Sequence, residues 1–294
     1  MSGPHILTEP AKAKVNLTLH VGRVIADVTD LYFGYHPLDS LVVFADIGDV
    51  ITAELADETT LSITGPFAKG LSAGPDNLIL KAVKAVSAHG AVPALKITLT
   101  KNLPVAAGLG GGSANAAAML RVLSRLVELP QNIWEDIALS LGADVPVCLL
   151  SKTSHMTGIG EGVFPVTELS AMPAVLVNPR VPTPTRAVFK AFDEITGVNA
   201  PRETPRAQLP KGDMLARALN GRNDLELPAI AAMPIIDDVL RALSGQSGAQ
   251  IARMSGSGAS CFALFERAAQ AAAAAEAITK AHPDWWVIST KLGD

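Results

Sequence analysis

The segment Pro104-Val-Ala-Ala-Gly108-Leu-Gly110-Gly111-Gly112-Ser113-Ala-Asn115 decides how this chain of 294 residues is interpreted. Its glycines let backbone N–H groups approach an anion without a Cβ in the way. The segment opens directly into an alanine-rich helix, whose first turn offers free N–H groups and the positive end of the helix dipole. It lacks the Lys-Ser/Thr pair of a Walker A loop and the spacing of a dinucleotide-binding turn. The alternative is a flexible turn, but each ordered glycine costs roughly 1 kcal/mol of backbone entropy. The segment therefore predicts a phosphate-binding loop.

Hydrophobic periodicity outside this loop predicts an α+β chain. Apolar residues that alternate with polar ones, or short apolar runs, indicate strands at Val15–Val21, Thr60–Thr64, Leu95–Thr100, 174–178, Gln250–Met254, Ser260–Phe265 and Trp286–Thr290. The stretch Leu41–Leu55 predicts two short strands broken at Asp46–Gly48, with Thr60–Thr64 pairing with the second of them. Strands precede helices in each half without strict β-α alternation, so we expect two lobes, residues 1–160 and 161–294.

Capping residues place the helices. Asp76 or Asn77 caps a helix that ends near Gly90, and Ser113 caps the alanine-rich helix. Gly142 ends the helix that follows, just before Asp144. Two further helices are expected at Ile235–Leu243 and Ala268–Lys280.

Composition excludes several classes of function. The net charge is −4 and aromatic residues make up only 4%, so the chain has neither the basic surplus nor the stacking side chains of a general nucleic-acid binder. Hydrophobic residues reach 49%, but no uncharged window approaches the roughly 20 residues that span a membrane. Cys148 and Cys261 lie in apolar runs, which favours buried free thiols over a disulfide or a metal site. The N-terminus lacks a secretory signal pattern, so we expect a cytoplasmic protein.

Three weaker motifs stand far from the glycine segment. The small residues of Ser255–Ser260 predict a tight turn against a ligand or another backbone, although a plain glycine turn fits equally well. Lys14 lies in phase with Asn16 on a predicted strand, where a solvated strand-end lysine is the alternative. Asp144 precedes an apolar run and is costly to desolvate unless it is paired, although it could simply form a local turn.

Taken together, the motifs around Lys14, the glycine segment, Leu141–Val147 and Met254–Phe265 resemble the GHMP kinase superfamily of galactose, homoserine and mevalonate kinases. The resemblance covers nearly the whole chain. It implies a two-lobed α+β fold, with an ATP-binding N-terminal lobe of ribosomal-protein-S5-like topology and a ferredoxin-like C-terminal lobe. It also implies an ATP-dependent kinase of small-molecule alcohols. More narrowly, the chain is similar to members that phosphorylate the 2-hydroxyl of a diphosphocytidyl methylerythritol.

This resemblance implies a role for each matching residue. Asp144 would accept the proton of the substrate hydroxyl, and Lys14 would hold that hydroxyl and the carboxylate in place. Mg²⁺ would arrive with ATP, without a separate protein metal site. The residues expected to bind ATP are Pro104, Val105, Ala106, Ala107, Gly108, Leu109, Gly110, Gly111, Gly112, Ser113 and Asn115. Those expected to bind the acceptor are Asn16, Tyr35, His36, Thr185, Phe189, Ser257 and Gly258, with Tyr35 and Phe189 sandwiching the cytosine.

One stretch departs from the family pattern. Phe33 stands where the family usually has Asp before Gly-Tyr-His, and the segment Val24–Phe33 is longer than the pattern. Two other functions therefore stay open: a mevalonate or homoserine kinase of the same superfamily, and a non-catalytic RNA-binding module. We expect a small-molecule substrate, no nucleic-acid or membrane partner, and a monomer or weak homodimer.

Overall fold

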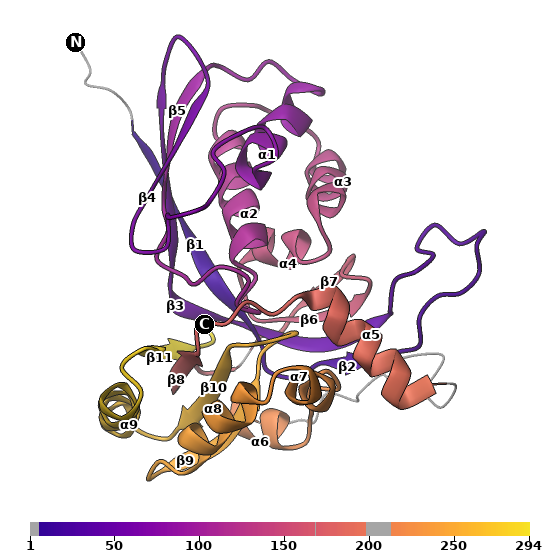
Figure 1. Ribbon diagram of the computed structural model, residues 1–294. Helices are drawn as coiled ribbons and strands as arrows, with labels where there is room; N and C mark the ends of the chain where they lie inside the picture. Colours follow the sequence, from indigo (N-terminus) through magenta and orange to yellow (C-terminus); the bar gives the residue numbers. More distant parts are fainter. Residues whose placement is uncertain (1–5, 168, 198–212) are drawn as a thin grey trace. The chain divides into compact units, whose positions relative to one another are not determined.

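The computed structural model describes residues 6–167, 169–197 and 213–294, which form two compact units (Figure 1). The first unit runs up to Ala13 and includes Ile47–Val105 and Gly110–Ser151, while the second is made of Lys14–Asp46, Ala106–Leu109 and the chain from Lys152 onward. Each unit is thus assembled from separate stretches of sequence. The predicted boundary near residue 160 assumes two continuous domains and stays a prediction.

The first unit packs helices beside a sheet (Figure 1). Its strands lie in the order β4 (Thr60–Thr64), β5 (Leu95–Thr100) and β3 (Leu38–Leu55), and β1 (Leu7–Asn16) also pairs with β3. In β5, Leu95, Ile97 and Leu99 are buried while Lys96 is exposed, so one face of the sheet packs on the core. The helices are α1 (Leu78–Ser87), α2 (Gly111–Leu123), α3 (Gln131–Leu141) and α4 (Val145–Leu150).

Helix α2 is the centre of this unit, because α1, α3 and α4 all pack against it. Its alanines 114 and 116–118 are buried, and side chains this small let neighbouring helices approach closely. Asn77 caps α1 by accepting a hydrogen bond from the N–H of Ile79, which decides between the two predicted caps. The prediction that Ser113 caps α2 is wrong. Gly110 occupies the cap in a left-handed conformation at φ +62°, which places Ser113 in the first turn.

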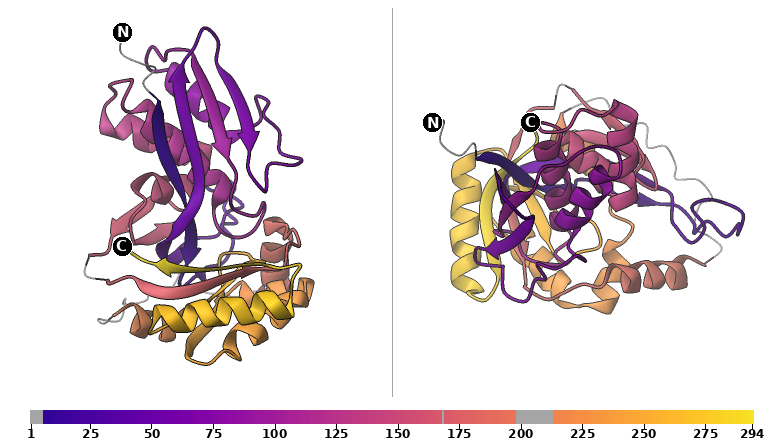
Figure 2. Two further views of the ribbon diagram at one scale, coloured as in Figure 1. Left: turned by 90° about the vertical axis from the view of Figure 1, so that its left-hand side faces the viewer. Right: turned by 90° about the horizontal axis from the view of Figure 1, so that it is seen from above.

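The second unit is built on the antiparallel strands β11 (Trp286–Leu292), β8 (Met172–Asn178), β10 (Cys261–Phe265) and β9 (Ala249–Met254), in that order. Helices α8 (Ile235–Ser244) and α9 (Ala268–Ala281) pack on this sheet, and α9 runs along it in Figure 2. Alternate residues of β8 and β10 enter a core with the apolar faces of both helices. The predicted strands and helices of this region are therefore confirmed.

The remaining strands of this unit are linked to the first half of β3. β2 (His20–Val21) and the hairpin of β6 (Ser154–Gly158) and β7 (Gly162–Pro165) extend from it, since β2 and β6 both pair with β3. Three helices complete the unit: α5 (Thr185–Thr196), α6 (Met214–Leu219) and α7 (Glu226–Ala232). Cys148 in the first unit and Cys261 in the second are buried and form no disulfide, as predicted.

Three strand predictions are corrected by the structure. β3 continues through the predicted break at Asp46–Gly48, because Gly48 marks a close approach: a Cβ there would lie 2.2 Å from the carbonyl oxygen of Ala11. β4 pairs in parallel with β5 rather than with β3. The strand predicted at Val15–Val21 is divided, since β1 ends at Asn16 and β2 begins at His20. Among the described residues, no helix is long and apolar enough to cross a membrane.

Candidate active site

The glycine segment is held at both of its ends. Ala106–Leu109 packs with the second unit, while Gly110–Ser113 begins α2 in the first. Gly108 and Gly110 have φ angles of +71° and +62°, a region that favours glycine. Among the described residues no side chain caps α2, which leaves the N–H groups of its first turn without a capping side chain. This geometry is compatible with a phosphate loop, which stays a prediction.

A buried ion pair lies beside the start of α2. Lys101 Nζ contacts Asp49 Oδ2 at 2.5 Å, and a Cβ at Gly111 would lie only 3.2 Å from the same nitrogen. Asp49 also accepts hydrogen bonds from the N–H groups of Asn102 and Leu103 at 2.7 and 2.9 Å. Burial lowers the pKa of Lys101, and the Asp49 carboxylate opposes that shift. The loop therefore has a cation next to its first helical residue.

Sequence reasoning missed Lys101 and Asp49. The sequence carries a faint signal, because Lys101 is the first of the three residues between strand β5 and Pro104, where the glycine segment begins. Its partner Asp49 lies 52 positions earlier, in the strand that was predicted to be broken nearby. A lysine that leads from a strand into a glycine loop is worth testing as part of the anion site.

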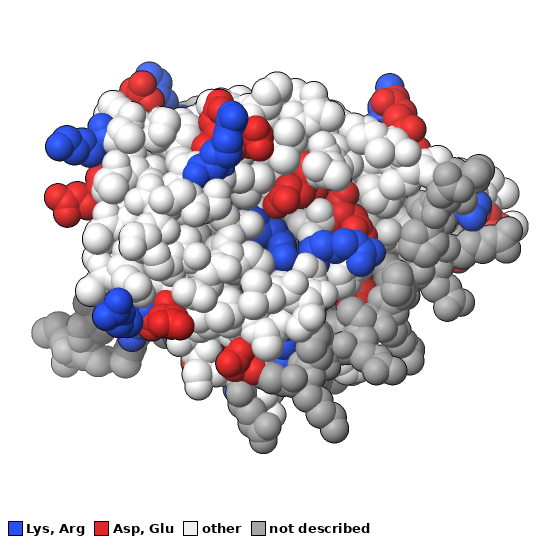
Figure 3. Space-filling view, turned by 90° about the horizontal axis from the view of Figure 1, so that it is seen from below, with Lys and Arg blue, Asp and Glu red and all other residues white. Residues whose placement is uncertain are grey.

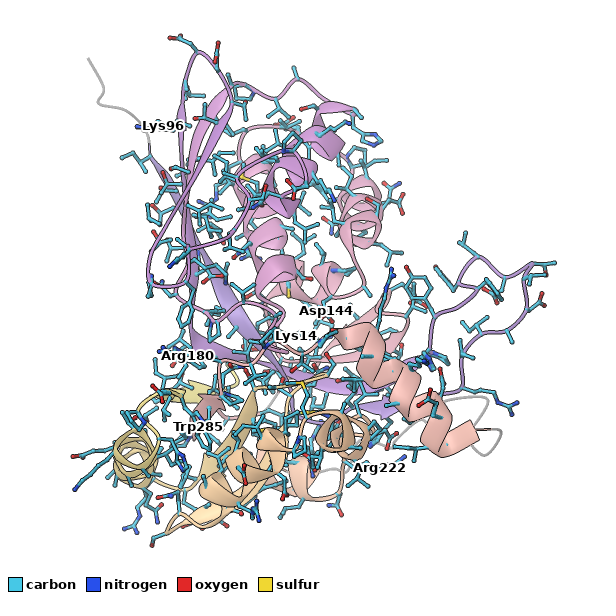
Figure 4. The ribbon with its side chains drawn as sticks, in the orientation of Figure 1. Lys14, Lys96, Asp144, Arg180, Arg222 and Trp285 are labelled. Carbon is cyan, nitrogen blue, oxygen red and sulfur yellow. The ribbon has the colours of Figure 1, made fainter. Side chains whose placement is uncertain are left out.

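Asp144 belongs to the first unit and lies at the start of α4 (Figure 4). Gly142 ends α3 as predicted, and Pro146 suits the first turn of the next helix. The Asp144 side chain forms no capping hydrogen bond with α4. Val145 and Val147 are buried and help to anchor α4, which packs on α2. The carboxylate and the helical end of the glycine segment thus stand on two helices in contact.

Lys14 belongs to the second unit and lies near the end of β1 (Figure 4). Its N–H donates a hydrogen bond to the carbonyl oxygen of Leu109 at 2.9 Å, which links the strand to the glycine segment. The residue is only 4% exposed, so the alternative of a solvated lysine is wrong. Val15 on the opposite side of the strand is also buried, which shows that both faces of β1 are covered here.

The Ser255–Ser260 turn packs directly against the glycine segment. Ser255 Oγ donates to the carbonyl oxygen of Gly108 at 3.0 Å, and the N–H of Ser260 donates to the carbonyl oxygen of Ala107 at 3.1 Å. A Cβ at Gly108 would lie 2.5 Å from the carbonyl oxygen of Ser255 and 2.7 Å from that of Gly258. This close approach of two backbones accounts for the glycines and excludes a plain surface turn.

The structure brings together some of the predicted acceptor residues. The rings of His36 and Phe189 have centroids 5.0 Å apart, and Thr185 Oγ1 lies 3.0 Å from Ser257 Oγ. His36 Nδ1 donates to the carbonyl oxygen of Gly22 at 2.9 Å. Tyr35 is 53% exposed, so it is available to a ligand but is not packed with the other two rings.

The described residues contain no group of three or more His, Cys, Asp or Glu side chains arranged to hold a metal ion.

Two family models match this chain. The model of the GHMP kinases N terminal domain matches residues 77–152, and that of the GHMP kinases C terminal matches residues 207–284. The first match contains the whole glycine segment and Asp144, and the second contains the Ser255–Ser260 turn.

Curated relatives match over nearly the whole length. A 4-diphosphocytidyl-2-C-methyl-D-erythritol kinase of Dinoroseobacter shibae is 48% identical over 284 residues, covering 96% of this chain and 93% of that protein. One of the same name from Ruegeria pomeroyi is 50% identical over 281 residues, covering 94% and 95%.

Solved structures agree. The crystal structure of a 4-(cytidine 5'-diphospho)-2C-methyl-D-erythritol kinase has a TM-score of 0.76 and 32% identity, covering 98% of this chain and all of that one. The structure of L. major mevalonate kinase in complex with R-mevalonate has a TM-score of 0.63 at 16% identity, which shows a shared fold alone.

Proposed function

Since this chain belongs to the GHMP kinase family, and is thus an ATP-dependent kinase of small molecules, we propose that its acceptor is 4-diphosphocytidyl-2-C-methyl-D-erythritol. The γ-phosphoryl group of ATP is transferred to the 2-hydroxyl, which gives the 2-phosphate and ADP. The reaction is a step of the non-mevalonate route to isoprenoid precursors. The choice of acceptor is supported by the full-length relatives, whose identity to this chain is 45–50%.

The observation that carries the kinase chemistry is the uncapped start of α2 immediately after Gly108–Gly110. Bare backbone N–H groups and the helix dipole favour the phosphates of ATP there. Lys101 also lies beside Gly111, although its charge is balanced by Asp49. The charge on the transferring phosphoryl group can therefore be stabilised by groups that are already in place.

Asp144 and Lys14 are the proposed catalytic residues. The 2-hydroxyl oxygen forms a bond to the γ-phosphorus, the bond from that phosphorus to the β,γ-bridging oxygen breaks, and Asp144 accepts the hydroxyl proton. Lys14 is proposed to hold that hydroxyl with its positive charge. Phosphoryl transfer depends mainly on positioning and on charge neutralisation, which is what these two side chains supply.

Mg²⁺ enters with ATP in this proposal. Phosphate oxygens and water would be its main ligands, with the Ser113 hydroxyl as a candidate protein oxygen. The ion supplies neutralisation of phosphate charge when it is bound.

The acceptor is recognised by residues of the second unit. Tyr35, His36 and Phe189 bind the cytosine ring, supported by the packing of His36 on Phe189. Asn16, Thr185, Ser257 and Gly258 line the rest of the acceptor site, supported by the hydrogen bond between the Thr185 and Ser257 hydroxyls.

The test is incubation of the full chain with ATP, Mg²⁺ and the cytidyl diphosphate acceptor, followed by ³¹P NMR. We expect a new phosphomonoester signal in step with ADP formation. Mevalonate and homoserine are run in parallel as alternative acceptors. Turnover of either one, with the cytidyl compound left unchanged, would contradict the proposed substrate.

An RNA-binding function has less support. On the face shown in Figure 3, most Lys and Arg side chains lie next to Asp or Glu and much of the surface is uncharged, so its described residues form no basic stripe. The cytoplasmic location and the monomeric or weakly dimeric state stay predictions, which cell fractionation and sedimentation analysis would check.

A further inference from the structure

Asn16 lies in a short chain of hydrogen bonds inside the second unit. Its side-chain Nδ2 donates to Ser40 Oγ at 2.8 Å, and Ser40 Oγ donates to the carbonyl oxygen of Thr18 at 2.6 Å. The backbone N–H of Asn16 donates to Ser255 Oγ at 3.1 Å. Asn16, Ser40 and Ser255 are all at most 2% exposed, so these hydrogen bonds are shielded from bulk solvent.

In this chain of hydrogen bonds, each group has a fixed role as donor or acceptor. A serine hydroxyl carries one proton, and that of Ser40 is used on the Thr18 carbonyl oxygen. Ser40 can therefore only accept from Asn16, which requires the NH₂ end of the amide to face Ser40. The carbonyl oxygen Oδ1 must then face the other way. A residue at position 40 without a hydroxyl would remove this constraint, and the amide could rotate by 180°.

Asn16 Oδ1 is buried and has no hydrogen-bond partner among the described residues. It faces the Ser255–Ser260 turn, since a Cβ at Gly256 would lie 3.4 Å from this oxygen. An unsatisfied buried acceptor costs about 1–3 kcal/mol, so a group that remains unsatisfied in the free protein calls for an explanation.

We propose that Ser40 is a positioning residue, which holds the Asn16 amide so that its oxygen accepts a hydrogen bond from a hydroxyl of the polyol part of the acceptor. The proposal rests on the proposed function, because it needs Asn16 to bind the acceptor. Ser40 itself touches no substrate. Its effect on catalysis therefore passes entirely through Asn16.

The experiment is a double-mutant cycle in the full chain, with Ser40→Ala, Asn16→Ala and the double variant. KM and kcat for the cytidyl acceptor are measured at saturating ATP, and urea unfolding gives the stability of each variant. We expect Ser40→Ala to raise the acceptor KM about three- to tenfold, the equivalent of one hydrogen bond, with the KM for ATP unchanged. In the Asn16→Ala background the same substitution should raise the acceptor KM less than about twofold.

Two further variants separate positioning from structure. Ser40→Thr keeps the hydroxyl and should restore the acceptor KM. Thr18→Val is the matched control, because it removes Thr18 Oγ1, which accepts a buried hydrogen bond from the N–H of Leu41, and keeps the backbone carbonyl oxygen that accepts from Ser40. It should lower stability and leave the acceptor KM unchanged.

Three outcomes would overturn the proposal while the wild type still phosphorylates the cytidyl acceptor. They are an unchanged KM in Ser40→Ala, an equal rise in KM with and without Asn16, and a rise in Thr18→Val as large as that in Ser40→Ala. The first is also the result expected if an internal water satisfies Oδ1. A wild type that fails to use the cytidyl acceptor contradicts the proposed function instead, so the two failures are distinguishable.

Discussion

Replacing Gly108 by alanine tests the close approach of the glycine segment to the Ser255–Ser260 turn. At φ +71° the left-handed backbone costs an L-residue about 1–2 kcal/mol. The new Cβ would also lie 2.5 Å from the carbonyl oxygen of Ser255, about 1 Å nearer than an ordinary contact. The two nearest atoms, the carbonyl oxygens of Ser255 and Gly258, belong to the backbone. One of the two loops must therefore move to remove the clash, at a further cost of about 1–3 kcal/mol.

We therefore expect Gly108→Ala to lower the free energy of unfolding by about 2–5 kcal/mol and to weaken ATP use. Gly70→Ala is the matched control, because Gly70 has a φ of +83° but no atom within 4 Å of the point that a Cβ would occupy. Gly70→Ala should lower the free energy of unfolding only by the cost of the left-handed backbone, about 1–2 kcal/mol, and should leave the KM for ATP unchanged. Urea unfolding and the KM for ATP are measured for both variants. Equal losses of stability in the two would refute the contact argument.

Three substitutions test the proposed catalytic and nucleotide-binding residues. Asp144→Ala should lower kcat about 10²- to 10⁴-fold without lowering the melting temperature, and near wild-type turnover would remove Asp144 from the mechanism. Lys14→Ala should lower kcat by at least about tenfold, since the hydroxyl and carboxylate lose their cation; full activity would exclude the proposed role. Gly111→Val should raise the KM for ATP, because the valine side chain would crowd Lys101 and the phosphates. An unchanged ATP affinity in calorimetry would contradict the proposed phosphate-binding loop.

Local patterns in the sequence were sufficient for much of the fold. The alternation of Leu95, Ile97 and Leu99 predicted β5, and Gly142 marked the end of α3. These features depend on residues within one element. The pairing of β4 with β5 could not be predicted in this way, because it joins residues 36 positions apart and the short turn before β4 favoured the wrong neighbour.

For the candidate site too, features set by local sequence were predicted and features set by long-range contacts were missed. The glycine segment and the Ser255–Ser260 turn were found because small residues in a row leave a visible signal. The ion pair of Lys101 and Asp49 was missed, because neither residue is unusual until strand pairing brings them together. Gly48 resembles a strand break in the sequence, whereas its lack of a Cβ permits β3 to contact the backbone at Ala11. The position of the Asn16 amide likewise depends on Ser40, 24 positions away.

The hydrogen bonds that Ser255 and Ser260 make to Gly108 and Ala107 have a consequence for biosynthesis. The Ser255 hydroxyl bonds to a carbonyl oxygen 147 positions earlier in the chain. A nascent polypeptide that has already formed α2 still lacks the anchor that holds Ala106–Leu109. We therefore expect a ribosome-bound intermediate to acquire nucleotide affinity only after the Ser255–Ser260 turn has emerged from the exit tunnel.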